Sequence, residues 1–136
     1  MGFESIAHTA DIGLRVWGRT LEELFSEAAV GMMSLMADTA GVEKRQTRVA
    51  QADGPDNESL LVAWLNEILF LVESERFIFA QVRIETLGGG VVRGVLAGTT
   101  VGADFRFAHQ IKAATYHDIE VKKTPKGFET VVIFDV

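Results

Sequence analysis

Three short segments of the sequence concentrate side chains that can do chemistry. They are residues 8–13 (HTADIG), residues 112–118 (KAATYHD) and the chain end, 134–136 (FDV). Carboxylates, imidazoles and an ammonium group are common components of metal sites and of acid–base sites. Each segment taken alone also has a simpler structural interpretation.

The chain end places the Asp135 side chain next to the main-chain carboxylate of Val136. A strand pattern runs up to the last residue, so both groups are expected at the end of a folded strand. Neighbouring carboxylates repel each other unless a cation or a hydrogen-bond donor neutralises them. Oxygen ligands of this kind suit Ca²⁺, Mg²⁺ or Mn²⁺. Taken alone, however, the chain end is more simply explained by carboxylates that lie in water.

The polar residues of the other two segments also have ordinary structural interpretations. Asp11 could cap a turn, and His8 could be a half-buried histidine with one hydrogen bond. Strand alternation over residues 111–123 places Lys112 and His117 on opposite faces, which argues against a simple Lys–His catalytic pair. His117 then falls on the apolar face, where a lone histidine is usually a core residue, and Lys112 is expected to be solvated.

Length and composition describe one globular domain. The chain has 136 residues, 48% of them hydrophobic and 24% charged, no cysteine and a net charge of −6. The lack of cysteine excludes disulfides, thiolate nucleophiles and Cys-ligated metals. The acidic balance disfavours broad electrostatic attraction to nucleic acid or to an anionic membrane. Since neither a signal peptide nor a membrane-spanning apolar segment is evident, we expect a cytoplasmic protein without membrane association.

Several familiar catalytic motifs are absent from the sequence. Gly88-Gly89-Gly90 leads into a strand pattern, so it predicts a turn rather than a phosphate-binding loop before a helix. His8, His109 and His117 do not have zinc-ligand spacing, and no G-x-S-x-G nucleophile motif occurs.

The hydrophobic pattern predicts two helices among several strands. Thr20 and Glu23 have capping-box spacing before a helix over residues 21–37, in which Gly31 is expected to mark close packing. A second helix is predicted from Asn57 or Ser59 to Ser74. The predicted strands cover residues 3–7, 12–17, 42–52 (an edge strand), 77–87, 91–97, 111–123 and 128–134, with hairpins at 88–90 and 125–127. This order predicts an α+β domain with two helices packed on a mostly antiparallel sheet.

Taken together, the motifs resemble the archease family over nearly the whole chain. They are HTADIG at 8–13, TLEE at 20–23, WLNE at 64–67, IKAATYH at 111–117 and the acidic residue second from the end. Their order and spacing are specific, so residues 1–136 are interpreted as one archease domain. The segment 102–108 is less typical of the family.

The resemblance implies an accessory protein rather than an enzyme. Archeases are expected to activate an RNA ligase of the RtcB type, which carries guanylate on a histidine and uses GTP and metal. The implied role is to promote ligase guanylylation and multiple turnover in tRNA splicing and RNA repair. RNA is then contacted only through the ligase, and the oligomeric state is left open.

The resemblance also implies site residues. Family metal ligands correspond to Asp11, Asp135 and Val136, the last through a main-chain oxygen, and the implied cation is Ca²⁺, with Mg²⁺ or Mn²⁺ as alternatives. Lys112 corresponds to a further functional lysine. His117 falls in the family's Tyr-His motif, and His8 lies in the first motif, so both are secondary candidates for activation.

These implications require Asp11 and Asp135 to meet in space. Our hypothesis is that the acidic tip they would form enters the ligase active site and adjusts metal or GTP phosphate geometry. One alternative is a metal-dependent phosphohydrolase that uses Asp11, Asp135 and His117, although such a site has no clear general base. The other is a general protein-folding or interaction module with an incidental cation.

Overall fold

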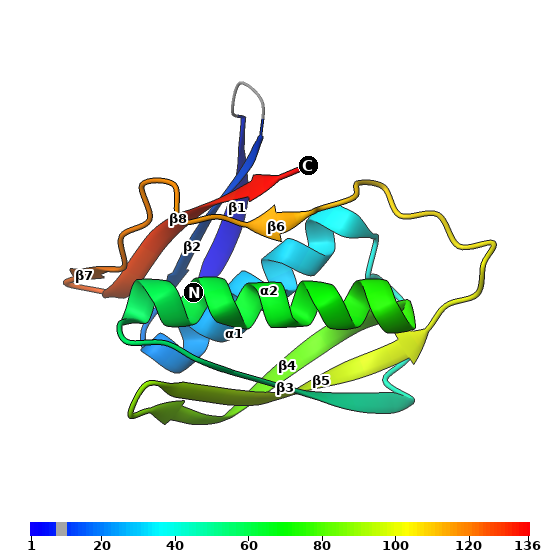
Figure 1. The fold of residues 1–136 in the computed structure, drawn as a ribbon, viewed down its shortest axis with the longest axis horizontal. Coiled ribbons are helices and arrows are strands. Elements are labelled where there is room, and N and C mark those ends of the chain that lie inside the picture. The colour runs from blue at the N-terminus through cyan, green and yellow to red at the C-terminus, as the bar shows by residue number, and fades with distance from the viewer. Residues whose placement is uncertain (8–10) are drawn as a thin grey trace.

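The computed structural model describes residues 1–7 and 11–136 (Figure 1). Eight strands and two helices are present in this part of the chain. In chain order they are β1 (Gly2–Ala7), β2 (Ile12–Gly18), α1 (Leu21–Met36), β3 (Gln46–Asp53), α2 (Asn57–Glu75), β4 (Phe77–Gly88), β5 (Val91–Thr100), β6 (Ala113–Ala114), β7 (Lys122–Thr124) and β8 (Gly127–Asp135). Both helices lie where the sequence predicted them, and the α+β prediction is confirmed.

The strands form two antiparallel sheets. One has the order β1-β2-β8-β6, with β7 also paired to β8, and the other has the order β3-β5-β4. The predicted hairpin at 88–90 is confirmed, and Gly89 and Gly90 have φ values of 62° and 77°. Those left-handed conformations suit glycine in a tight hairpin turn. The β3 strand is an edge strand as expected, but it begins at Gln46 rather than at residue 42.

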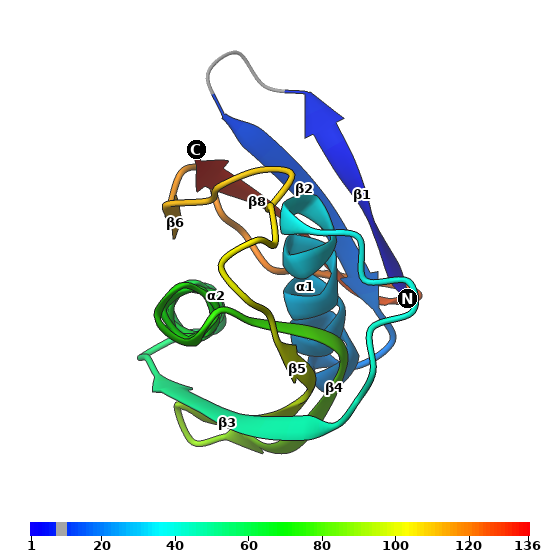
Figure 2. The same ribbon diagram turned by 90° about the vertical axis from the view of Figure 1, so that its right-hand side faces the viewer.

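Helix α1 lies between the two sheets (Figure 2). The predicted cap is confirmed, because the Thr20 hydroxyl oxygen accepts a hydrogen bond from the Glu23 amide at 3.1 Å. The Glu23 carboxylate reaches back and accepts from the Arg19 amide at 2.7 Å. The buried side of α1 includes Leu24, Phe25, Ala28, Ala29, Met32, Met33 and Met36. Contact with sheets on two sides explains why so many of its positions are apolar.

Gly31 confirms the close packing expected from its place inside α1. A Cβ atom at this position would lie 2.8 Å from Leu14 Cδ2 and 2.8 Å from Phe3 Cγ. We therefore expect Gly31→Ala to destabilise the fold by about 1–2 kcal/mol, although alanine is the better helix former. Urea unfolding followed by circular dichroism measures this change. Gly102→Ala is the control, since a Cβ there meets nothing within 4 Å, and equal stability of the two variants would contradict the packing argument.

Helix α2 covers the three-stranded sheet and also contacts β6 (Figure 1). Its N-terminal cap is Asp56, whose carboxylate accepts a hydrogen bond from the Ser59 amide at 2.7 Å. This hydrogen bond lowers the pKa of Asp56 below its ordinary value. Trp64 and Leu65 are fully buried, whereas Phe70 on the same helix is 68% exposed. Within residues 1–7 and 11–136, neither helix has the length and apolar character needed to span a bilayer.

Candidate functional site

Strands β2 and β8 bring two of the predicted aspartates together. Their antiparallel register places Ile12 opposite Phe134, and the ladder continues to Gly18 opposite Phe128. Asp11 immediately precedes the first of these pairs, and Asp135 immediately follows it. The two aspartates therefore occupy neighbouring positions at the same end of adjacent strands, about 5 Å apart in the strand-to-strand direction.

A third segment joins the same end of the sheet from the other side of β8. Ala113 in β6 lies opposite Asp135, and the Lys112 amide donates a hydrogen bond to the Asp135 carbonyl oxygen at 2.8 Å. The side chains of Lys112 and Asp135 are exposed, as is Val136. We call Asp11, Lys112, Asp135 and Val136 the strand-end cluster. Figure 1 shows its setting, where the C-terminus lies near the start of β2.

Asn66 of α2 positions the segment that carries Lys112. Its side-chain Nδ2 donates to the Ala114 carbonyl oxygen at 3.1 Å, and its Oδ1 accepts from the Ala114 amide at 2.8 Å. Ala114 is 4% exposed, so these hydrogen bonds satisfy backbone groups that water reaches poorly. Asn66 belongs to the WLNE motif, but the sequence did not predict this role for it. The only indication in the sequence was a polar residue beside the apolar face of a predicted helix.

The predicted strand over residues 111–123 is wrong for most of its length. Only Ala113–Ala114 and Lys122–Thr124 belong to strands. The Thr115 amide and hydroxyl both donate to the Ile133 carbonyl oxygen, at 2.9 and 2.8 Å. Further along, the Val121 amide donates to the Glu58 carboxylate of α2 at 2.8 Å. Side chains of α2 thus form hydrogen bonds with some of the backbone groups that a neighbouring strand would otherwise pair.

His117 does not lie in the core, so that prediction is wrong. Its side chain is 59% exposed, and its Nε2 lies 3.4 Å from the Asp118 carboxylate. Strand alternation breaks before this residue, and Asp118 has a φ of 49°, which turns the chain. His117 therefore lies in an exposed turn that follows the β6 segment. His8, the other histidine candidate, lies outside the described residues.

The strand-end cluster has a donor set that fits a hard divalent cation. The Asp11 and Asp135 carboxylates and a main-chain oxygen of Val136 are all oxygen ligands, the type that Ca²⁺ and Mg²⁺ prefer. Across the described residues, no three His, Cys, Asp or Glu side chains gather closely enough to hold a metal by themselves. A cation here would therefore need main-chain oxygen or water among its ligands.

Comparison with known proteins is consistent with this arrangement of motifs. A sequence model of the Archease protein family (MTH1598/TM1083) matches residues 3–136. The chain belongs to the archease family. Protein archease of Archaeoglobus fulgidus is 36% identical, and the alignment covers 100% of this chain and 100% of the relative. Protein archease of Methanosarcina acetivorans is 35% identical, with 98% of this chain and 95% of the relative covered.

Solved structures show the same archease fold. The solution structure of Methanobacterium thermoautotrophicum protein 1598 has a TM-score of 0.83 and 32% identity, and covers 99% of each chain. A Thermotoga maritima protein described as an archease and possible chaperone has a TM-score of 0.69 and 21% identity, and covers 98% of this chain and 96% of its own. At that identity the second likeness supports the fold alone.

Proposed function

We propose that this archease-family protein is an accessory activator of an RtcB-type RNA ligase. It promotes guanylylation and multiple turnover of the ligase in tRNA splicing and RNA repair, and it is not itself the ligase. The observation that carries the proposal is the convergence of Asp11, Asp135 and Lys112 at one end of the five-stranded sheet. This end carries charged side chains, and those of Lys112 and Asp135 are exposed, as groups that enter another protein's active site must be.

Each residue of the strand-end cluster has a role in this proposal. The Asp11 and Asp135 carboxylates and a Val136 main-chain oxygen would hold a divalent cation, with Ca²⁺ as the expected ion. A bound cation would supply positive charge for a phosphate oxygen and would relieve repulsion between the carboxylates. The Lys112 ammonium adds a positive charge suited to a phosphate or to an acidic surface of the ligase. Docking this tip beside the ligase's nucleotide would raise the fraction of ligase in a competent geometry.

Multiple-turnover RNA ligation tests the proposal directly. Asp11→Ala, Asp135→Ala and Lys112→Ala are each expected to reduce stimulation of the ligase at least about tenfold, the loss typical of a positioned charged group. Asp104→Ala is the matched control, since Asp104 is an exposed loop aspartate outside the strand-end cluster. Full stimulation by all three cluster variants would refute the mechanism.

Calorimetric titration with Ca²⁺ tests the cation separately from the ligase. The unmodified chain is expected to bind Ca²⁺, while Asp135→Asn, which keeps the shape but removes the charge, is expected to bind at least tenfold more weakly. Parallel titrations with Mg²⁺ and Mn²⁺ establish the preference. If the unmodified chain releases no binding heat with any of the three ions, the metal part of the proposal is wrong.

Two further outcomes would support other functions. Nucleotide hydrolysis by the purified chain alone would favour the phosphohydrolase, for which the described residues offer a sparse carboxylate set. Retention of ligase binding and stimulation by all the cluster variants would favour a general interaction module. A cytoplasmic location is part of the proposal, because the proposed ligase and its RNA substrates are expected there.

A further inference from the structure

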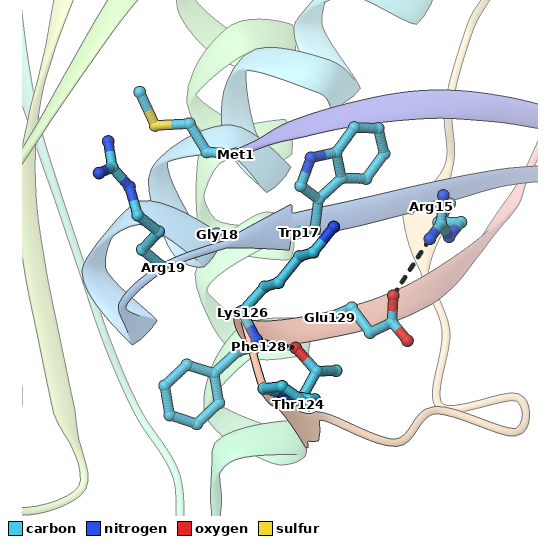
Figure 3. A pocket seen from close by; sticks show the side chains of 10 residues that line it. Met1, Arg15, Trp17, Gly18, Arg19, Thr124, Lys126, Phe128 and Glu129 are labelled. Carbon is cyan, nitrogen blue, oxygen red and sulfur yellow. Dashed lines mark hydrogen bonds and ion pairs between the residues drawn. The ribbon is translucent and has the colours of Figure 1, made fainter.

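The opposite end of the five-stranded sheet carries a groove of about 770 Å³. Its walls come from the end of β2, from the β7–β8 hairpin and from Met1. Figure 3 shows the side chains around it, among them Trp17, Arg19, Lys126 and Phe128. We call this feature the hairpin groove. It lies some seven residues along β2 from the strand-end cluster, or about 24 Å.

Positive charge gathers at this groove although the whole chain is acidic. Lys126 lines the groove, whereas Lys122 and Lys123 are on the same hairpin but do not line it. These are three of the five lysines in the sequence, and all three are exposed. In the described part of the chain no carboxylate lies within ion-pair distance of these three side chains. Arg19 adds a further guanidinium that is 77% exposed, with the Glu23 carboxylate 3.9 Å away. This local excess of cations suits a polyanion.

Aromatic side chains lie among these cations. Trp17 and Phe128 line the groove and are only partly buried. The Arg15 guanidinium lies 5.0 Å from the centroid of the Trp17 ring. Arg15 is held there by Glu4 at 3.1 Å and by Glu129 at 3.2 Å, and these hydrogen bonds raise its pKa. An aromatic and guanidinium surface beside lysines offers base stacking and phosphate contacts together, the combination found in proteins that bind single strands.

We propose that the hairpin groove binds single-stranded RNA directly, with phosphates on Arg19 and Lys126 and a base against Trp17. An acidic peptide would use the same cations but would leave the aromatic groups without a matching partner. The choice of RNA over DNA rests on the proposed function. The proposal departs from the expectation that RNA is contacted only through the ligase. Because the groove and the strand-end cluster lie at opposite ends of β2, both can be occupied at the same time.

Fluorescence anisotropy with a short labelled oligoadenylate and the purified chain tests the proposal. We expect measurable binding at about 50 mM salt that weakens as salt rises. Arg19→Ala/Lys126→Ala is expected to reduce affinity about tenfold or more. The control Lys44→Ala/Arg106→Ala removes the same charge from exposed sites outside the groove and is expected to change affinity less than twofold.

A second variant separates stacking from charge. Trp17→Leu is expected to weaken oligoadenylate binding at least fivefold while the salt dependence stays the same. Bound RNA should also quench the partly exposed Trp17 but leave the buried Trp64 emission unchanged. If Trp17→Leu fails to fold, the Arg19→Ala/Lys126→Ala variant and this fluorescence measurement still decide the outcome.

Three results would overturn the proposal. They are no binding of oligoadenylate by the unmodified chain, equal losses in the groove and control double variants, or equally tight binding of a polyglutamate peptide. The last result would assign the groove to an acidic protein partner instead. None of these measurements uses the ligase, so their failure is distinguishable from failure of the proposed activation, which is tested by the strand-end variants.

Discussion

A Trp64→Ala variant is expected to lose about 4–5 kcal/mol of unfolding free energy. Trp64 is fully buried on α2, and its indole Nε1 donates a hydrogen bond to the Phe25 carbonyl oxygen of α1 at 3.1 Å. Truncation to alanine would leave a large cavity, which costs about 3–5 kcal/mol, and would remove the indole hydrogen bond to the Phe25 carbonyl oxygen. Since domains of this size have total stabilities of about 5–15 kcal/mol, the variant should be close to unfolding at 37 °C.

Urea unfolding followed by far-ultraviolet circular dichroism measures this loss. Phe70→Ala is the control on the same helix, because it also removes an aromatic ring but from a side chain that is 68% exposed. We expect the control to stay within about 0.5 kcal/mol of the unmodified chain. Similar stabilities of the two variants would show that Trp64 does not hold α1 and α2 together.

An Asn66→Ala variant is expected to loosen the segment that carries Lys112 while the rest of the fold stays intact. Asn66 donates one hydrogen bond to the Ala114 carbonyl oxygen and accepts another from the Ala114 amide. Among the described residues, β6 pairs with no strand other than β8 that could compensate for their loss. Leaving these backbone groups unpaired costs about 1–3 kcal/mol, which corresponds to roughly fivefold to hundredfold faster local opening. Stimulation of the ligase should fall as this segment loosens, because the segment holds Lys112 next to Asp135.

Amide hydrogen exchange at Ala114 detects the loosening, and the ligation assay detects its consequence. Glu67→Ala is the matched control, since Glu67 is the next residue of α2 and is exposed. The expected pattern is faster Ala114 exchange and weaker stimulation in Asn66→Ala alone. Unchanged exchange in that variant would mean that β8 by itself holds the segment in place.

The two ends of the five-stranded sheet have opposite chemistry. The end where β2 starts and β8 finishes carries Asp11 and Asp135, whereas the end with the β7–β8 hairpin carries lysines and Trp17. A net charge of −6 therefore gives a poor description of either end. The composition argued against nucleic-acid binding by the chain as a whole, and the inference of an RNA groove rests on how the charges are distributed.

Elements with local signals were predicted well from the sequence. The α1 cap depends on Thr20 and Glu23, which are three residues apart, and the hairpin turn depends on adjacent glycines. Helix periodicity likewise requires only a short window of sequence. These features are determined by interactions among near neighbours in the chain, so a single sequence was sufficient for both helices, the hairpins and the α+β class.

The sequence by itself also determined the family motifs and the candidate residues at the strand-end cluster. Only the tertiary structure decided how they are arranged, because Asp11 and Asp135 come from nearly opposite ends of the chain and meet through β2–β8 pairing. Alternation over residues 111–123 predicted a strand, yet side chains of Asn66 and Glu58 bind that backbone instead. Such long-range hydrogen bonds can outweigh a local preference for strand structure, because they give buried backbone groups their partners. A local sequence pattern does not indicate which distant side chains those partners will be.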